Sequence, residues 1–120
     1  MKNNYLPTDY QTFIATSRYA RWLEDEGRRE TWGETVHRYM RHIVYQALPS
    51  LGEPVDDYDY GALEIEIRDA ILSLEVMPSM RSLMTAGKAA DRDNTCMYNC
   101  SYLPVDDPKS FDEAMFILLC

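Results

Sequence analysis

The sequence predicts an α+β chain in which a mainly helical N-terminal region is followed by one strand and one helix. Capping boxes at Thr8 and at Thr31 each precede apolar residues, which favours helices in the first half of the chain. Near the other end, the run Met97 to Leu103 lies between a polar segment and Pro104, which is typical of a short strand. Asp107 and Pro108 then provide an N-cap and a first helical residue.

The helices of the first half are predicted in chain order. Thr8 and Gln11 begin the first, and Leu23 to Arg29 is expected to be a connecting segment around a glycine. Thr31 and Glu34 begin the second, whose apolar stripe comprises Trp32, Val36, Tyr39, Met40, Ile43, Val44 and Ala47. A third helix is predicted from Tyr60 to about Leu74, with an apolar face at Leu63, Ile67, Ala70, Ile71 and Leu74. Ser79 and Gly87 would bound a short helix, and residues 88–94 are expected to be a loop.

The C-terminal part is predicted to be half of a strand–helix–strand unit. Strand alternation would place Tyr98, Cys100 and Tyr102 on one face and Met97, Asn99, Ser101 and Leu103 on the other. The last helix is apolar nearly all round from Ala114 to Cys120, so we expect other structure to cover it. We therefore expect the chain to be truncated or split after residue 120, by an intron, an intein or a division into two frames.

Composition narrows the classes of function. The formal net charge of −8 disfavours general nucleic-acid binding, which needs a basic surface. No apolar run approaches the roughly 20 residues that span a bilayer, and the N-terminus has no secretory signal, so a cytoplasmic location is expected. Arg21, Arg28 and Arg29 could form a local anion site, but pairing with the neighbouring acidic residues (Glu24, Asp25, Glu26 and Glu30) is the default interpretation.

Cysteine is the residue type that draws attention to possible chemistry. The three cysteines, Cys96, Cys100 and Cys120, lie in the last quarter of the chain, and their odd number argues against a disulfide framework. Zinc usually takes four ligands, and His37 and His42 are not expected to share a helix face, so no metal site is predicted. From the residues alone, Cys100 is either a small core residue or a redox group.

Several segments together resemble a known family. They are MPSMRSLMTAG at 77–87, YNCSY at 98–102, VDDP at 105–108 and the helix start SFDE at 110–113, preceded by SRYARW at 17–22 and GRRETW at 27–32. This order resembles the N-terminal region of the catalytic subunit of ribonucleotide reductases, most closely the adenosylcobalamin-dependent triphosphate reductases. The resemblance extends from about Phe13 to Cys120.

The resemblance implies a fold and a division of the chain. The family has a ten-stranded α/β barrel preceded by a helical region. Residues 1–90 would be the N-terminal helical region, and residues 91–120 would be the start of the catalytic barrel, with Met97 to Leu103 as its first strand.

The resemblance also implies the chemistry. Cys100 would be one of two thiols that reduce the ribose 2′ position and end as a disulfide, with Asn99 and Ser101 beside the substrate and Ser82 near its phosphates. Cys96 has no family role and is interpreted as incidental, with accidental formation of a disulfide left open. The implied partners are a ribonucleotide, the remaining C-terminal part of the reductase and a thioredoxin-type reductant, and the implied cofactor is adenosylcobalamin.

The elements that would complete this chemistry are not in the chain. The thiyl-bearing cysteine, the second reducing cysteine, the cobalamin-binding elements and the C-terminal cysteine pair are all missing, so the chain alone is expected to be inactive. The residues do not distinguish a triphosphate from a diphosphate substrate. The alternative readings are a stand-alone acidic helical interaction protein, which would dock a partner through its apolar C-terminal helix, and a non-functional gene remnant.

Overall fold

The computed structural model describes residues 5–51 and 60–119, and the part it describes is mostly helical with one two-stranded sheet. The expected α+β composition is compatible with this architecture. In chain order the elements are α1 (Asp9–Ile14), η1 (Ala15–Tyr19), β1 (Trp22–Leu23), β2 (Arg28–Arg29), α2 (Trp32–Tyr39), η2 (Met40–Val44), α3 (Tyr45–Ala47), η3 (Leu48–Leu51), α4 (Tyr60–Leu72), α5 (Met80–Thr85), α6 (Lys88–Arg92), η4 (Asn94–Met97) and α7 (Lys109–Leu119).

Both predicted capping boxes are confirmed. At α1 the Gln11 amide donates to Thr8 Oγ1 at 3.2 Å, and the Thr8 amide donates to the Gln11 side chain at 3.1 Å. At α2 the Thr31 amide donates to Glu34 Oε2 at 2.7 Å, while Thr31 Oγ1 accepts from the Glu34 amide. Each box satisfies backbone donors that the first helical turn leaves unpaired.

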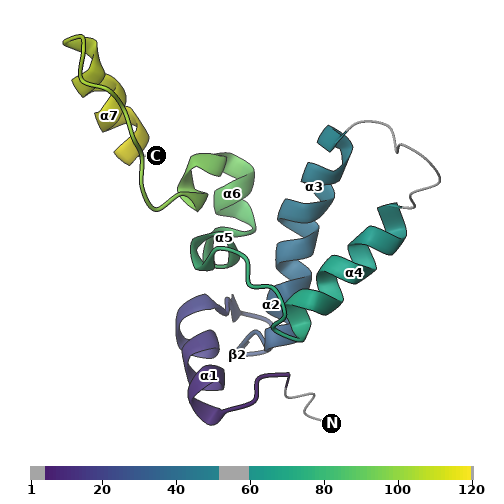
Figure 1. The fold of residues 1–120 in the computed structure, drawn as a ribbon. Helices are drawn as coiled ribbons and strands as arrows, with labels where there is room; N and C mark the ends of the chain where they lie inside the picture. The colour runs from purple at the N-terminus through teal and green to yellow at the C-terminus, as the bar shows by residue number, and fades with distance from the viewer. Residues whose placement is uncertain (1–4, 52–59, 120) are drawn as a thin grey trace.

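The core lies between α4 and a continuous rod formed by α2, η2 and α3 (Figure 1). The rod presents Val36, Met40, Val44 and Leu48, spaced four residues apart, to the buried side chain of Ile71. In a regular α-helix, side chains spaced four residues apart rotate gradually around the helix axis. The π-helical segment η2 has wider turns, which offset this rotation, so the four side chains stay on one side of the rod. Burial of each large apolar side chain stabilises the fold by roughly 1.5–3 kcal/mol.

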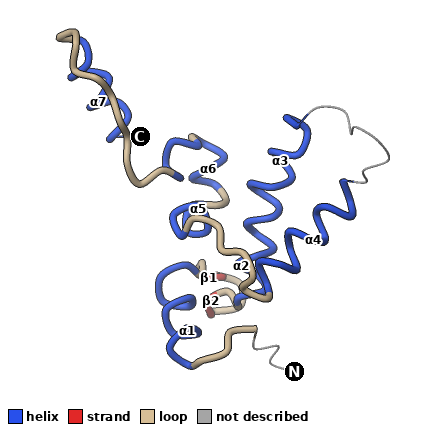
Figure 2. The backbone as a smooth tube through the Cα atoms, in the orientation of Figure 1, coloured by secondary structure: helices blue, strands red, loops and turns tan. Residues whose placement is uncertain are grey.

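Two segments that were expected to be loops contain regular structure. The segment from Leu23 to Arg29 belongs to a small hairpin, in which β1 and β2 pair antiparallel and Gly27 turns with a φ of 61° (Figure 2). Residues 88–94 were wrongly expected to be an irregular loop, because Lys88–Arg92 forms α6. Ala89 and Ala90 are strong helix formers, and the Asp91 amide bonds to the Gly87 carbonyl at 2.9 Å.

The predicted strand from Met97 to Leu103 is not formed. Met97 ends the 3₁₀ turn η4, and residues 98–106 have no regular secondary structure. A strand needs a neighbour that pairs with its backbone groups, and the sheet in the described part of the chain contains only β1 and β2. The expected alternation of faces is absent as well, since Tyr98, Asn99, Cys100, Ser101 and Tyr102 are all exposed.

The helix α7 begins where predicted but stands away from the body of the protein. The Lys109 amide donates to Asp107 Oδ1 at 2.8 Å, which confirms Asp107 as a capping residue. The chain extends away from η4, turns, and returns along α7, which lies beside the irregular segment (Figures 1 and 2). The resulting Cα radius of gyration is 17.4 Å, against about 14 Å for a compact domain of this length.

The apolar side chains of α7 are largely uncovered. Five of them are between 62% and 78% exposed, namely Phe111, Met115, Phe116, Leu118 and Leu119. A cluster of exposed apolar side chains of this size usually marks an interaction surface. Among all the helices of the described residues, α7 included, none has both the length and the apolar composition that crossing a bilayer requires.

Candidate functional site

A small pocket lies where the irregular segment meets α7. It has a volume of about 100 Å³ and is lined by Arg81, Thr95, Cys96, Tyr98, Asn99, Cys100, Ser101, Ile117 and Leu118. The pocket therefore joins three parts of the chain: the start of α5, the segment from η4 to residue 101, and the last turn of α7. At ~30 Å³ for each molecule, it has room for only a few waters.

Local hydrogen bonds hold one end of the segment that carries Cys100. Asp93 caps η4 by accepting from the Thr95 amide at 2.9 Å, and the Tyr98 amide donates to the Thr95 carbonyl at 3.1 Å. Residues 99–106 belong to no helix or sheet in the described structure. The thiol of Cys100 is free, and the residue is exposed.

The structure brings three of the four sequence-predicted site residues together. Asn99, Cys100 and Ser101 line one pocket, whereas Ser82 does not line it. Ser82 is half-buried in α5, and its neighbour Arg81 lines the pocket instead. Successive side chains of an α-helix point about 100° apart. Arg81 therefore points toward the pocket while its neighbour Ser82 points elsewhere.

Cys96 is a pocket residue that the sequence interpretation set aside as incidental. It lies in η4, is half-buried, and has a free thiol like that of Cys100. The spacing of four residues could have suggested a pair of neighbouring thiols. The third cysteine, Cys120, lies outside the described residues.

A buried ion pair that sequence reasoning missed ties the helical body together. The Arg38 guanidinium donates to both carboxylate oxygens of Glu30, with Nε to Oε1 at 2.9 Å. It also donates to the carbonyls of Leu83, Ala86 and Tyr19, at 2.9, 2.6 and 3.1 Å. One side chain of α2 thus connects α5, η1 and the residue after β2. All five N–H groups of the guanidinium are engaged in these bonds, so the side chain serves the fold.

Ionisation of two carboxylates is coupled to these contacts. Burial raises the pKa of Glu30, but hydrogen bonds from Arg38, from the Arg21 amide and from Thr35 outweigh it, so the net pKa is lowered. The Glu34 carboxylate accepts two hydrogen bonds of 2.8 Å from Arg28 and one from the Thr31 amide, which lower its pKa to about 2. Arg28 also contacts Glu26, which confirms the expected pairing with a neighbouring acid for this arginine. The expectation was wrong for Arg21 and Arg29, whose guanidinium groups donate to the carbonyls of Met84 and Ala20, and Glu30 pairs with Arg38 instead.

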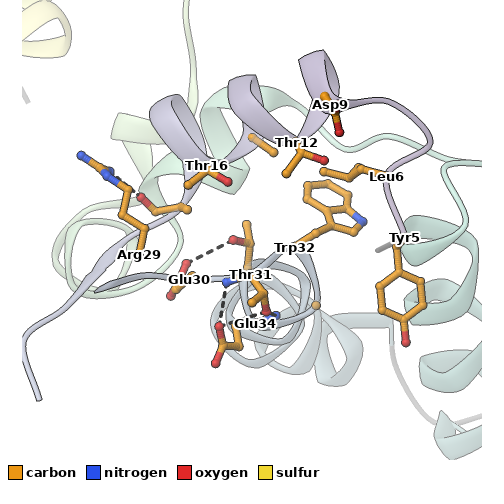
Figure 3. A pocket seen from close by; sticks show the side chains of 14 residues that line it. Tyr5, Leu6, Asp9, Thr12, Thr16, Arg29, Glu30, Thr31, Trp32 and Glu34 are labelled. Atoms are coloured by element: carbon orange, nitrogen blue, oxygen red, sulfur yellow. Dashed lines mark hydrogen bonds between the residues drawn. The ribbon is translucent and has the colours of Figure 1, made fainter. Parts of the chain in front are cut away.

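A larger pocket of about 720 Å³ lies between α1 and the start of α2 (Figure 3). Its two glutamates are already engaged: Glu30 binds Arg38 and Thr35, and Glu34 binds Arg28 and Thr31. The indole of Trp32 lies toward one end of the pocket (Figure 3), and its buried Nε1 has no hydrogen-bond partner among the described residues. We assign no chemistry to this pocket, because both of its glutamates serve the fold.

A third pocket lies along α2 and η2 and is bordered by both histidines. His37 and His42 border a space of about 430 Å³ together with Arg41. The π-helical turn η2 widens the helix, so residues five apart approach one side. His42 Nδ1 lies 3.0 Å from an Asp91 carboxylate oxygen. Within residues 5–51 and 60–119, no group of three or more His, Cys, Asp or Glu side chains is arranged to hold a metal ion.

Comparison of the chain with protein-family models, with curated proteins and with solved structures gives no match.

Proposed function

We propose that this chain forms the N-terminal part of an adenosylcobalamin-dependent ribonucleotide reductase and contributes Cys100 as one of two thiols that reduce the ribose 2′ position. One observation supports this proposal above the others. The exposed, free thiol of Cys100 shares a small pocket with the uncovered apolar helix α7. A partner that covers α7 would close this pocket at the same time.

The chemistry needs a second reducing thiol besides Cys100. Cys96 borders the same pocket, but the proposal does not assign it this role. Replacement of a 2′-hydroxyl by hydrogen consumes two electrons and two protons, and the oxygen leaves as water. Two thiols supply both, because their oxidation to one disulfide releases two electrons and two protons. In the proposal the second reducing thiol belongs to the remaining part of the reductase, and a thioredoxin-type protein later reduces the disulfide.

Coverage of α7 would also provide the environment that the reaction requires. A reaction that passes through a substrate radical needs a site from which water is excluded. In the isolated chain Cys100 is exposed, and Ile117 and Leu118 form only one wall of its pocket. We therefore expect the chain to be inactive until the rest of the enzyme packs against α7. The proposed location is the cytoplasm, where thioredoxin keeps thiols reduced.

The substrate phosphates would lie on the Arg81 side of the pocket. Arg81 is exposed, lines the pocket, and has no acidic partner among the described residues. Its guanidinium is suited to binding phosphate oxygens. The hydroxyl of Ser82, which the family resemblance suggested for this role, stays in the proposal as a secondary contact, together with Asn99 and Ser101.

The pocket beside Cys100 does not fit adenosylcobalamin. A space of about 100 Å³ is far too small for a corrin ring, so no step of the reaction is assigned to the cofactor within this chain. In the proposal the cofactor binds to other parts of the assembled enzyme.

Reconstitution of the enzyme tests the proposal. The chain would be combined, in trans or as a fusion, with the remaining part of an adenosylcobalamin-dependent reductase. The mixture would be supplied with a ribonucleoside triphosphate, adenosylcobalamin and dithiothreitol. We expect deoxynucleotide only when both parts are present, and we expect Cys100→Ser to abolish its formation without preventing complex formation. The matched control Cys96→Ser should retain activity. Full activity of the Cys100→Ser complex would refute the proposal.

The exposed side of α7 also favours a second candidate, an acidic helical interaction protein that docks a partner through this helix. The same experiment separates the two candidates. A complex that forms through α7 but yields no deoxynucleotide would favour the interaction protein. A chain that ignores the reductase part and aggregates would favour a non-functional remnant.

A further inference from the structure

We propose that Cys96 and Cys100 form a reversible intrachain disulfide, so that this thiol pair is an oxidative modification site in which Cys96 resolves oxidised Cys100. The disulfide itself does not depend on the proposed function. Its consequence rests on that function: a Cys100 thiol held in a disulfide would be withdrawn from nucleotide reduction.

The first argument is that both cysteines line the same small pocket. Cys96 at the end of η4 and Cys100 beyond it border a space of about 100 Å³. A disulfide requires Cα atoms roughly 4.4–6.8 Å apart. Four residue steps of fully extended chain would span about 13–14 Å, so the chain must fold back between the two cysteines. The hydrogen bond from the Tyr98 amide to the Thr95 carbonyl holds Cys96 and Met97 in the 3₁₀ turn η4, so residues 98–100 must make the rest of the return.

The second argument is that little structure resists closure of the bond. Residues 98–106 contain no helix or strand, and η4 is a four-residue 3₁₀ turn. Adjustment of the backbone between Cys96 and Cys100 would therefore disturb neither the core around Met40 nor the buried Arg38–Glu30 pair. Because the two thiols are so close in sequence, each is held near the other at high local concentration.

The third argument is the difference in exposure between the two thiols. Cys100 is exposed and meets an oxidant first, whereas Cys96 is half-buried. Hydrogen peroxide would transfer one oxygen to the Cys100 thiolate and form a sulfenic acid. Its other oxygen would leave as hydroxide, which becomes water after protonation. Attack of the Cys96 thiol on this sulfenic sulfur would form the disulfide and release one water. In balance, two thiols and one hydrogen peroxide give one disulfide and two waters.

Proteolysis of the intact chain provides a direct test. Cleavage after Arg92 and Lys109 yields a peptide that contains both Cys96 and Cys100, while Cys120 falls in the next peptide. The reduced chain would be treated with an equimolar amount of hydrogen peroxide, blocked with N-ethylmaleimide, digested with trypsin and weighed by mass spectrometry. We expect the 93–109 peptide to lose two hydrogen atoms and to carry no label, while the peptide with Cys120 still accepts label. Dithiothreitol should restore two labelled sites in the 93–109 peptide.

Matched variants sharpen this test. Cys120→Ser should form the same internal disulfide. With at least two equivalents of hydrogen peroxide, Cys96→Ser should instead accumulate sulfinic acid at Cys100 several-fold above the parent chain. Far-UV circular dichroism of each variant checks that the fold is kept. The test on the parent chain remains valid even if a variant fails to fold. A cross-link between the 93–109 and 110–120 peptides, a disulfide only between two chains, or persistent labelling of both sites would overturn the inference. Because no nucleotide or partner is used, these results are independent of the reductase test.

Discussion

Removal of the Arg38 side chain should destabilise the helical body strongly. Arg38 and Glu30 are 12% and 7% exposed, and the guanidinium also donates to three backbone carbonyls. Arg38→Ala would leave the Glu30 carboxylate buried without its cation, and truncation of one partner of a buried pair costs about 3–5 kcal/mol. The stranded carbonyls of Leu83, Ala86 and Tyr19 add to that cost. The loss is a large part of the 5–15 kcal/mol that typically stabilises a domain.

Urea denaturation followed by far-UV circular dichroism would measure this effect. The double variant Arg38→Ala/Glu30→Gln should lose less than the sum of the two single variants, because no buried charge remains to be stranded. If Arg38→Ala is too unstable to measure, Arg38→Lys keeps the charge and should cost less. Arg68→Ala is the matched control, because its ion pair with Asp69 is exposed, and the variant should lose less than about 1 kcal/mol. A loss below about 1 kcal/mol for Arg38→Ala would refute the reasoning, since that is the range of a surface pair.

Two further predictions concern pH and backbone conformation. The pKa of Glu34 is lowered from its ordinary value of 4.5 to about 2, so its contribution to stability is present above pH 4.5 and is lost as the pH falls toward 2. The melting temperature should therefore fall over that interval, and Glu34→Gln should flatten part of the fall in a thermal scan; an unchanged profile would contradict the role of Arg28 at this site. Gly87 has a φ of 122°, which side-chain-bearing residues rarely adopt, so Gly87→Ala should cost at least ~1 kcal/mol in the same urea assay. Gly33→Ala is the control, because Gly33 lies in a helix and an added Cβ would meet its nearest neighbour at 3.8 Å. This substitution should be neutral or stabilise the protein by up to ~1 kcal/mol. Equal effects of the two glycine substitutions would refute the strain argument.

Elements whose signals are local were predictable from the sequence. The capping boxes at Thr8 and Thr31 depend on side chains three residues from the groups that they bond, so spacing alone reveals them. The amphipathic stripe around Met40 follows from helical periodicity, and Val36, Met40 and Val44 are buried as expected. The stripe was wrong at its end, because Ala47 is exposed and Leu48 is buried instead. The cap at Asp107 and the apolar character of α7 were likewise visible in the sequence.

Features that depend on distant partners were not predictable. Arg38 bonds to carbonyls 45 and 48 residues away, and no spacing rule identifies such acceptors. The segment from Met97 to Leu103 has the composition of a strand, but composition supplies no pairing neighbour, and the described structure offers none. The π-helical turn η2 keeps Val36, Met40, Val44 and Leu48 on one side of the rod, and a regular α-helical period does not predict such a turn.

For the candidate site, the sequence alone determined that the cysteines lie in the last quarter of the chain and that an apolar helix follows Cys100. The tertiary structure decided that Cys96 and Arg81 join Cys100 in one pocket, and that Ser82 does not. The physical reason is that residue type and local periodicity are properties of the sequence itself. The direction in which a side chain points depends instead on how each element packs against the others.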